Sequence, residues 1–241
     1  MTSPLASIHT ARLARQDVAM IPFLKDGEFE EAYPESIRKL SRHHWTPVDV
    51  CRTAAQFLVT GAKTRVLDIG SGPGKFCAVG AAATEGHFTG VEQRENLVSA
   101  AKMMVRHYGL PRVEIAHANV TCVNFLHFDA FYLFNPFEEN VYPTLRIDFQ
   151  VELTPGLYVS YTDYVRRQLS MVPPGTKIAT YCGDCDEIPS CYDCLETSFA
   201  GRLKFWIKTR QPGPQEPVDE PYPSAPPFFG VRRSVRPLPP G

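Results

Sequence analysis

The chain has 241 residues, of which 44% are hydrophobic, with 25 basic against 26 acidic side chains. This length and apolar content suffice for one full core of an α/β domain. The balanced charge, with no basic stripe, argues against duplex nucleic acid as a partner, because its phosphates need neutralising. No apolar run approaches the roughly 18 residues that span a bilayer, and the N-terminus lacks a secretory apolar core. We therefore expect a soluble protein of the cytoplasm.

The first predicted elements are helical. Residues 1–45 are expected to form an N-terminal helical extension. A helix should then begin at Thr46-Pro47-Val48-Asp49, which offers a Thr N-cap, Pro at the first position and an acid in the first turn. That helix is expected to run to about Thr60.

The run from Val66 to Phe76 predicts a buried strand that ends in an acid, turns through three glycines and enters a helix over 75–84. The glycines stand at alternate positions, which differs from the G-x-G-x-x-G of dinucleotide-binding enzymes. Glycines in such a turn let a ligand lie against bare backbone, because no Cβ intervenes and positive φ costs little. The stretch therefore predicts a ligand site at the end of this strand.

A second strand, Phe88–Glu92, also ends in a carboxylate. In an open α/β sheet the ligand lies beyond the carboxyl ends of the strands, where an acid can hydrogen-bond a ribose diol. A solvated charge at a strand end is the alternative for an isolated Glu. The glycine turn upstream favours the ribose role for Glu92.

These two motifs resemble those of the class I S-adenosylmethionine-dependent methyltransferases, and the resemblance runs from about Thr46 to Lys208. It implies an α/β, Rossmann-like fold, a doubly wound seven-stranded, mostly parallel sheet with helices on both faces. It also implies S-adenosyl-L-methionine as the cofactor. In the family the glycine turn lines the methionine half of this cofactor, the second acid binds the ribose, and a later segment contacts the adenine. The implied cofactor-binding residues are Asp68, Gly70, Ser71, Gly72, Gly74, Glu92, Gln93, Asn119 and Val120.

In this family the segment before the first strand's helix often closes over the cofactor, and here it reads His43-His44-Trp45. The alternative is a core Trp45 with both histidines at the surface. Further on, apolar residues at helical spacing predict a helix ended by Gly109, followed by a third strand over 113–116. Asn119 then stands where family members commonly carry an acid against the adenine.

The fourth strand, Ala130–Phe134, is continuously apolar, as a central parallel strand should be, and runs into Asn135-Pro136-Phe137. Methyltransferases acting on amino or amide nitrogen often carry an Asn/Asp-Pro-Pro-aromatic motif here. The resemblance implies that Asn135 is the catalytic residue, accepting hydrogens from the target nitrogen. Because this chain has one proline where the motif has two, a role limited to shaping the turn is the alternative.

Strict alternation of apolar and polar residues over Ile147–Leu153 predicts a strand with one buried face. The surrounding acids would suit a cationic substrate such as a lysine amine, or form a solvated face. A helix over 161–172 and strands over 177–181 and 203–208 complete the domain. The acids are Glu138, Glu139, Asp148 and Glu152.

Two C-x-x-C pairs fall between the last two predicted strands, at Cys182/Cys185 and Cys191/Cys194. Paired C-x-x-C units are typical of tetrahedral zinc, but the short spacing between the pairs favours reduced or redox-labile thiols. We therefore assign no metal ligand. The other three cysteines are expected to be buried apolar residues: Cys51, Cys77 and Cys122.

From residue 211 onward the chain is rich in proline and poor in periodic apolar pattern, which predicts a disordered or surface-wrapping tail. Residues 46–210 would then form the cofactor-binding domain. The function implied is methyl transfer, with a nitrogen acceptor in a protein side chain or a small molecule. Two other functions remain open: a nicotinamide-dependent enzyme, disfavoured by the glycine spacing, and a non-catalytic cofactor-binding or partner-recruiting module.

Overall fold

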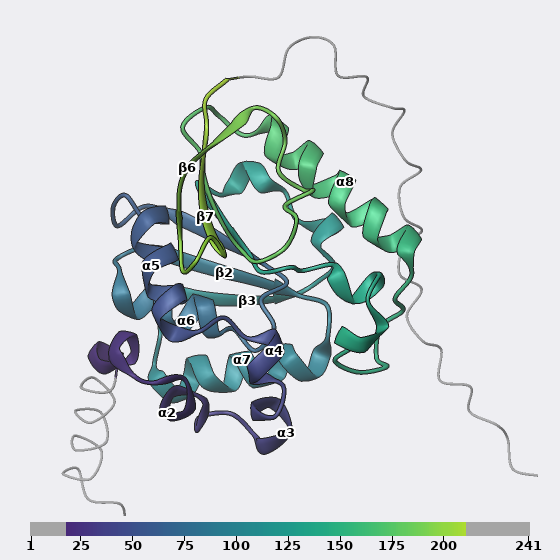
Figure 1. Ribbon diagram of the computed structural model, residues 1–241. Helices are drawn as coiled ribbons and strands as arrows, with labels where there is room; N and C mark the ends of the chain where they lie inside the picture. Colours follow the sequence, from purple (N-terminus) through teal and green to yellow (C-terminus); the bar gives the residue numbers. More distant parts are fainter. Residues whose placement is uncertain (1–17, 211–241) are drawn as a thin grey trace, which may run out of the picture. The chain divides into compact units, whose positions relative to one another are not determined.

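The computed structural model describes residues 18–210, and the first 17 residues and the predicted tail from residue 211 lie outside this range. Within it, one seven-stranded sheet has the strand order β3-β2-β1-β4-β5-β7-β6 (Figure 1). The first five strands are parallel, and β7 runs antiparallel to both β5 and β6. The strands are β1 Arg65–Ile69, β2 His87–Glu92, β3 Val113–His117, β4 Ala130–Leu133, β5 Lys177–Tyr181, β6 Tyr192–Ser198 and β7 Leu203–Lys208. The predicted fold class is confirmed.

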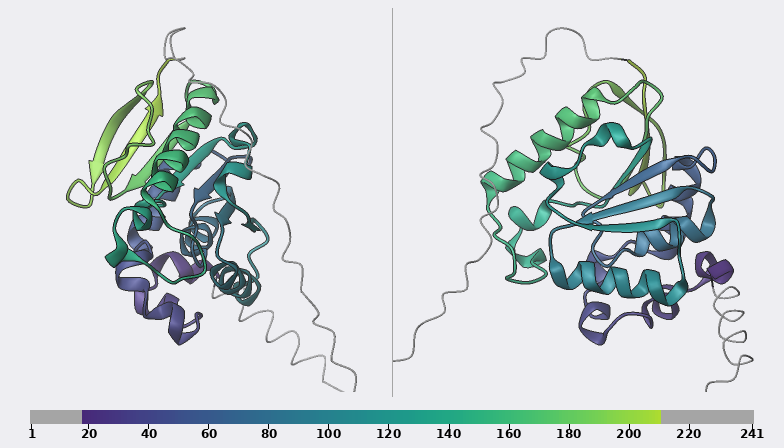
Figure 2. Two further views of the ribbon diagram at one scale, coloured as in Figure 1. Left: turned by 90° about the vertical axis from the view of Figure 1, so that its right-hand side faces the viewer. Right: turned by 180° about the vertical axis from the view of Figure 1, so that it is seen from behind.

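Helices cover both faces of the sheet (Figure 2). Successive residues of β1 belong to two separate buried clusters, one on each face. On β1, Val66 packs with α5, α6 and α7, whereas Leu67 and Ile69 pack with α8. The strand residues are buried on both sides, which explains the continuous apolar runs that predicted them. The main helices are α5 Val48–Leu58, α6 Lys75–Ala83, α7 Glu95–Tyr108 and α8 Pro155–Met171.

Short helices precede α5 and pack onto the same core (Figure 1). Buried apolar side chains join them to α5 and α6, among them Ile21, Phe29 and Ile37. The Tyr33 hydroxyl donates to the Pro73 carbonyl at 2.9 Å, which ties this region to the turn before α6. The short helices are η1 Ile21–Phe23, α2 Asp26–Glu30, α3 Glu35–Arg38 and α4 Ser41–His44.

The prediction of a strand over Ile147–Leu153 is wrong. This segment forms bends and irregular backbone, and Phe149 on its supposedly buried face is 87% exposed. Its Asp148 carboxylate instead accepts hydrogen bonds from Arg94 and Asn96 at the start of α7. A local alternation cannot reveal such a long-range ion pair.

The seventh strand is instead β6, which the sequence did not indicate. It is an edge strand whose residues from Asp193 to Thr197 are all exposed, so it shows no buried periodicity. A register shift between Cys194 and Glu196 interrupts its pairing with β7, as is common at sheet edges.

Two smaller predictions also differ from the structure. α5 begins at Val48 with Pro47 at the N-cap, and Thr46 lies outside it, sharing a hydrogen bond of 2.8 Å with the buried hydroxyl of Tyr132. Cys51 and Cys77 are buried as expected, but Cys122 is exposed on a 3-10 turn. Across residues 18–210 no helix combines the length and the apolar character needed to cross a membrane.

Candidate active site

A cleft opens at the carboxyl ends of β1, β2 and β4, where strand order reverses and ligands of open α/β sheets bind. The turn after β1 is fixed onto β2 by its backbone. The amides of Gly70 and Ser71 both donate to the Val91 carbonyl at 3.0 Å, and the Gly72 amide donates to Glu92 Oε2 at 3.1 Å. The turn is therefore held rigidly at the floor of the cleft.

Two of the three glycines are required by their surroundings. Gly70 has φ +73°, and a Cβ there would stand 2.9 Å from the Cβ of Pro136. Gly72 has φ +52°, and a Cβ there would stand 2.7 Å from Cζ3 of Trp45. Any side chain at either position would meet strain and a close contact. The alternate glycines thus let the turn pass between the segment after β4 and the segment before α5.

Glu92 is only 6% exposed and lines the centre of the cleft. Its Oε1 accepts the Arg94 amide at 2.8 Å, and its Oε2 accepts the Gly72 amide. Burial raises the pKa of Glu92, while these hydrogen bonds and the Arg94 charge oppose the rise. Each carboxylate oxygen keeps a further lone pair, which is the chemistry that a ribose diol needs.

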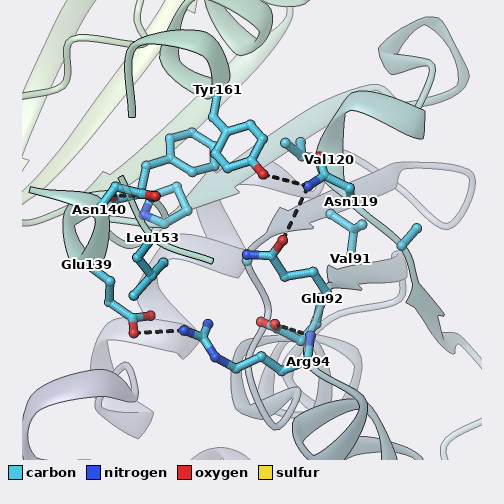
Figure 3. A pocket seen from close by; sticks show the side chains of 14 residues that line it. Val91, Glu92, Arg94, Asn119, Val120, Glu139, Asn140, Leu153 and Tyr161 are labelled. Carbon is cyan, nitrogen blue, oxygen red and sulfur yellow. Dashed lines mark hydrogen bonds and ion pairs between the residues drawn. The ribbon is translucent and has the colours of Figure 1, made fainter. Parts of the chain in front are cut away.

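One lobe of the cleft lies beyond β2 and β3 and carries a polar network (Figure 3). Asn119 donates to Gln93 Oε1 at 3.2 Å and to the Tyr161 hydroxyl at 2.9 Å, so α8 contributes to this lobe. Its own carbonyl oxygen accepts the Thr121 amide at 3.0 Å. The predicted residues Gln93, Asn119 and Val120 therefore meet here, but Asn119 is already engaged by three partners.

Arg94 lines both lobes, and no motif in the sequence singles it out. Figure 3 shows its guanidinium group facing Glu139. Its side chain is 5% exposed and pairs with Glu139 at 2.8 Å and with Asp148 at 3.1 Å. The same Glu139 carboxylate accepts the Ile147 amide at 2.8 Å. Arg94 thus holds residues 139–148 over the cleft. Two of the four acids expected to attract a cationic substrate are neutralised in this way.

The second lobe lies beside the glycine turn and beyond β4, and both lobes include Gly70, Glu92 and Arg94. The segment before α5 lines this lobe, and its closing over the cofactor stays a prediction. Of that segment, His43 is exposed, His44 half-buried and Trp45 buried. The residues of this lobe include His43, His44, Trp45, Gly72, Phe134, Asn135, Glu138 and Leu145.

Asn135 follows β4 in a left-handed conformation, with φ +42°. Its amide group packs directly against Gly183, after β5, where a Cβ would overlap the Asn135 oxygen. Its side chain also hydrogen-bonds Glu138. Burial raises the pKa of Glu138, with the Asp184 charge acting in the same direction. Asn135 therefore lies in the same lobe as Gly72, and its contact with the transferred group stays a prediction.

Three predicted cofactor residues do not line the cleft. Asp68 is buried beneath the turn, where the Cys77 thiol donates to it at 3.4 Å. Ser71 points its hydroxyl at Gly90 on β2, and that oxygen has no partner among the described residues. Gly74 faces α7 and β3. Their contact with a cofactor stays a prediction.

The C-x-x-C pairs do not converge. Cys182 and Cys185 are half-buried near the end of β5, Cys191 is buried and Cys194 is exposed on β6. Cys185 instead lies 3.4 Å from the Thr180 hydroxyl and 3.6 Å from the Lys204 ammonium. In the described range no group of three or more His, Cys, Asp or Glu side chains is arranged to hold a metal ion.

Comparison with known proteins agrees with this geometry. Residues 66–146 match the family model of the methyltransferase domain. An RNA methyltransferase from Salinibacter ruber, solved with S-adenosyl-L-homocysteine, is similar in structure, with 16% identity, a TM-score of 0.52, and coverage of 70% of this chain and 97% of that one. TrmN from Thermus thermophilus has 14% identity, a TM-score of 0.51, and coverage of 71% and 51%. No curated protein matches the sequence significantly.

The match over residues 66–146 identifies a methyltransferase domain, in agreement with the family that the sequence motifs resemble. The match supports the predicted methyltransferase activity and S-adenosyl-L-methionine as its cofactor. The two structural likenesses, at such low identity, support the fold alone. The cleft fits the cofactor, because Gly70 and Gly72 leave room along the turn and Glu92 presents free lone pairs beside them.

Proposed function

We propose that the enzyme methylates a nitrogen atom, in a protein side chain or a small molecule, and that Asn135 orients it. The observation that carries this proposal is the placement of Asn135 after β4, in a strained conformation, in the lobe that contains Gly72. Backbone strain of this kind costs about 1–3 kcal/mol and persists where the surroundings impose it. A residue that only shaped a turn would be better replaced by glycine.

The bound cofactor supplies an electrophilic methyl group, so the protein's remaining tasks are alignment and exclusion of water. An amide oxygen accepts hydrogen bonds from an N–H group and thereby directs the nitrogen lone pair. The contacts with Gly183 and Glu138 fix the amide plane of Asn135. We further propose that Gln93, Asn119 and Val120 bind the adenine side of the cofactor and that Glu92 binds its ribose.

The first experiment identifies the acceptor. Purified enzyme and tritiated S-adenosyl-L-methionine are added to undialysed cell extract, which retains small molecules, and samples are treated with protease or ribonuclease before counting. We expect label in protein or in a small amine, bonded to nitrogen. Label released by ribonuclease would show a nucleic-acid acceptor, against the expectation from the charge balance. Label on oxygen or carbon would refute the proposal.

The second experiment tests Asn135 itself. Asn135→Gly keeps the left-handed backbone but removes the amide, and should lower turnover by about 10²-fold with cofactor affinity nearly unchanged. Asn135→Asp retains the side-chain shape and an accepting oxygen, and should keep much more activity. Full turnover in the glycine variant would show that Asn135 only shapes the turn.

A further inference from the structure

His44 is anchored at the rim of the lobe that holds Asn135. Its neighbour Trp45 is 7% exposed, and the Trp45 indole nitrogen donates to the Ile37 carbonyl at 3.1 Å. The Trp45 ring also packs against Gly72 in the glycine turn. The backbone of His44 is therefore fixed relative to the turn, although α4 is only one turn long.

The imidazole of His44 is half-buried and available to accept a proton. Its ring centre lies 5.9 Å from that of Trp45, and within residues 18–210 no group hydrogen-bonds to its ring nitrogens. The carboxylates of the lobe are already engaged. Glu92 accepts two backbone amides, Glu139 is paired with Arg94, and Glu138 is bonded to Asn135.

We infer that His44 is the catalytic base that removes the proton which the acceptor nitrogen loses on methylation. The nitrogen lone pair forms the new C–N bond as the methyl C–S bond breaks, and the sulfur keeps that electron pair. The proton leaving the nitrogen goes to an imidazole nitrogen of His44 and from there to water. The inference rests on the proposed nitrogen acceptor.

The charges around His44 favour its neutral form. Burial lowers the pKa of His44 below its usual 6.5, and the charges of His43 and Arg94 lower it further. A neutral imidazole at pH 7 is ready to accept a proton. The acidic groups of the lobe would favour the protonated form, but burial has the largest effect and the next largest effects also come from cations. The charged groups facing the lobe are His43 from α4, Glu92 at the end of β2, Arg94 after β2, and Glu138 and Glu139 from η4 (Glu138–Asn140).

The test measures initial rates of tritium transfer from labelled cofactor to the acceptor in undialysed extract between pH 5.5 and 9. The wild-type rate should fall on the acid side with a midpoint below 6.5. His44→Gln should lower the rate at pH 7.5 by about 10²-fold or more and abolish that acid limb. Its affinity for S-adenosyl-L-homocysteine, measured by calorimetry, should change less than about threefold, because the base acts on the acceptor.

His43→Gln is the matched control. It removes one nearby cation that lowers the pKa of His44. The fall of the rate at acidic pH should therefore remain, with its midpoint moved to higher pH, toward the usual histidine pKa. Glu138→Gln tests the rival base in the same lobe. Loss of the limb in Glu138→Gln but not in His44→Gln would overturn the inference, as would an unchanged profile in His44→Gln with the methyl on nitrogen.

A second measurement does not need an acceptor. Nitrogen-15 spectra of the imidazoles, with and without S-adenosyl-L-homocysteine, should show the His44 signals shifting on binding and titrating below 6.5. Exposed His127, outside the lining of both lobes, is the internal reference. No response of His44 would place it outside the reacting centre and refute the inference. A methyl found on oxygen would refute the nitrogen acceptor alone.

Discussion

Lys75 is the first residue of α6, directly after the glycine turn, and its ammonium is buried. Its side chain is 3% exposed, with Nζ 2.5 Å from Glu30 Oε1 and 2.7 Å from Asp26 Oδ1. Glu30 is also buried, at 9% side-chain exposure, and accepts a hydrogen bond from Ser41. The helices before α5 are thus linked to the turn through a buried charge pair.

Lys75→Met should destabilise the fold by about 3–5 kcal/mol, because it leaves the carboxylate of Glu30 buried without its cation. Replacing both partners by apolar side chains removes the uncompensated charge. The double variant Lys75→Met/Glu30→Met should therefore recover most of that loss, since such replacements are often nearly neutral. Lys39→Met breaks an exposed pair with Glu35 and should cost at most about 1 kcal/mol.

The assay is equilibrium unfolding in urea, followed by circular dichroism, with the free energy of unfolding taken from linear extrapolation. Two results would contradict the argument. Either Lys75→Met costs no more than Lys39→Met, or the double variant is as unstable as Lys75→Met alone. Asp26 is half-exposed, so its part of the pair is screened by water and should not rescue the single variant.

Two further predictions concern the carboxylates beside the turn. Glu92→Gln removes the charge from the proposed ribose contact and should weaken S-adenosyl-L-homocysteine by about 1–3 kcal/mol, roughly 5- to 150-fold in calorimetry; unchanged affinity would exclude the contact. Burial raises the pKa of Asp68 to about 7, so between about pH 4 and 7 the folded protein keeps a proton that the unfolded chain releases, and stability from this group falls as the pH rises. Asp68→Asn should remove this pH dependence, so its melting temperature relative to wild type should rise with pH. The rise should correspond to at most about 4 kcal/mol in the free energy of unfolding, and a difference that does not change with pH would contradict the argument.

The fold and the floor of the cleft could be predicted because their signals are local. A strand buried on both faces requires a continuous apolar run, so β1 and β4 are visible in the sequence. Gly70 and Gly72 are visible because positive φ and close packing leave only glycine. Glu92 follows from its place at the end of the neighbouring strand.

What the sequence did not reveal depends on contacts between distant segments. In the sequence Arg94 cannot be told from a surface cation, because its ion pairs with Glu139 and Asp148 form only in the folded chain. The segment over 147–153, expected as a strand, instead forms irregular backbone whose Asp148 bonds Arg94. β6 was missed because an edge strand with an exposed outer face has no periodic apolar pattern to detect.

Two residues with unusual backbone conformation lie at the carboxyl ends of β4 and β5, close to the cleft. Asn135 after β4 and Cys182 after β5 both have positive φ, at +42° and +58°, although neither is glycine. β4 and β5 are adjacent and parallel, so both residues stand at the carboxyl edge of the sheet, next to the turn after β1. Glycine adopts positive φ more readily than either residue, and Asn adopts it more readily than Cys. Of these two residues only Asn135 lines the cleft and carries a side chain able to accept a hydrogen bond from an N–H group, which is the reason we place the acceptor there.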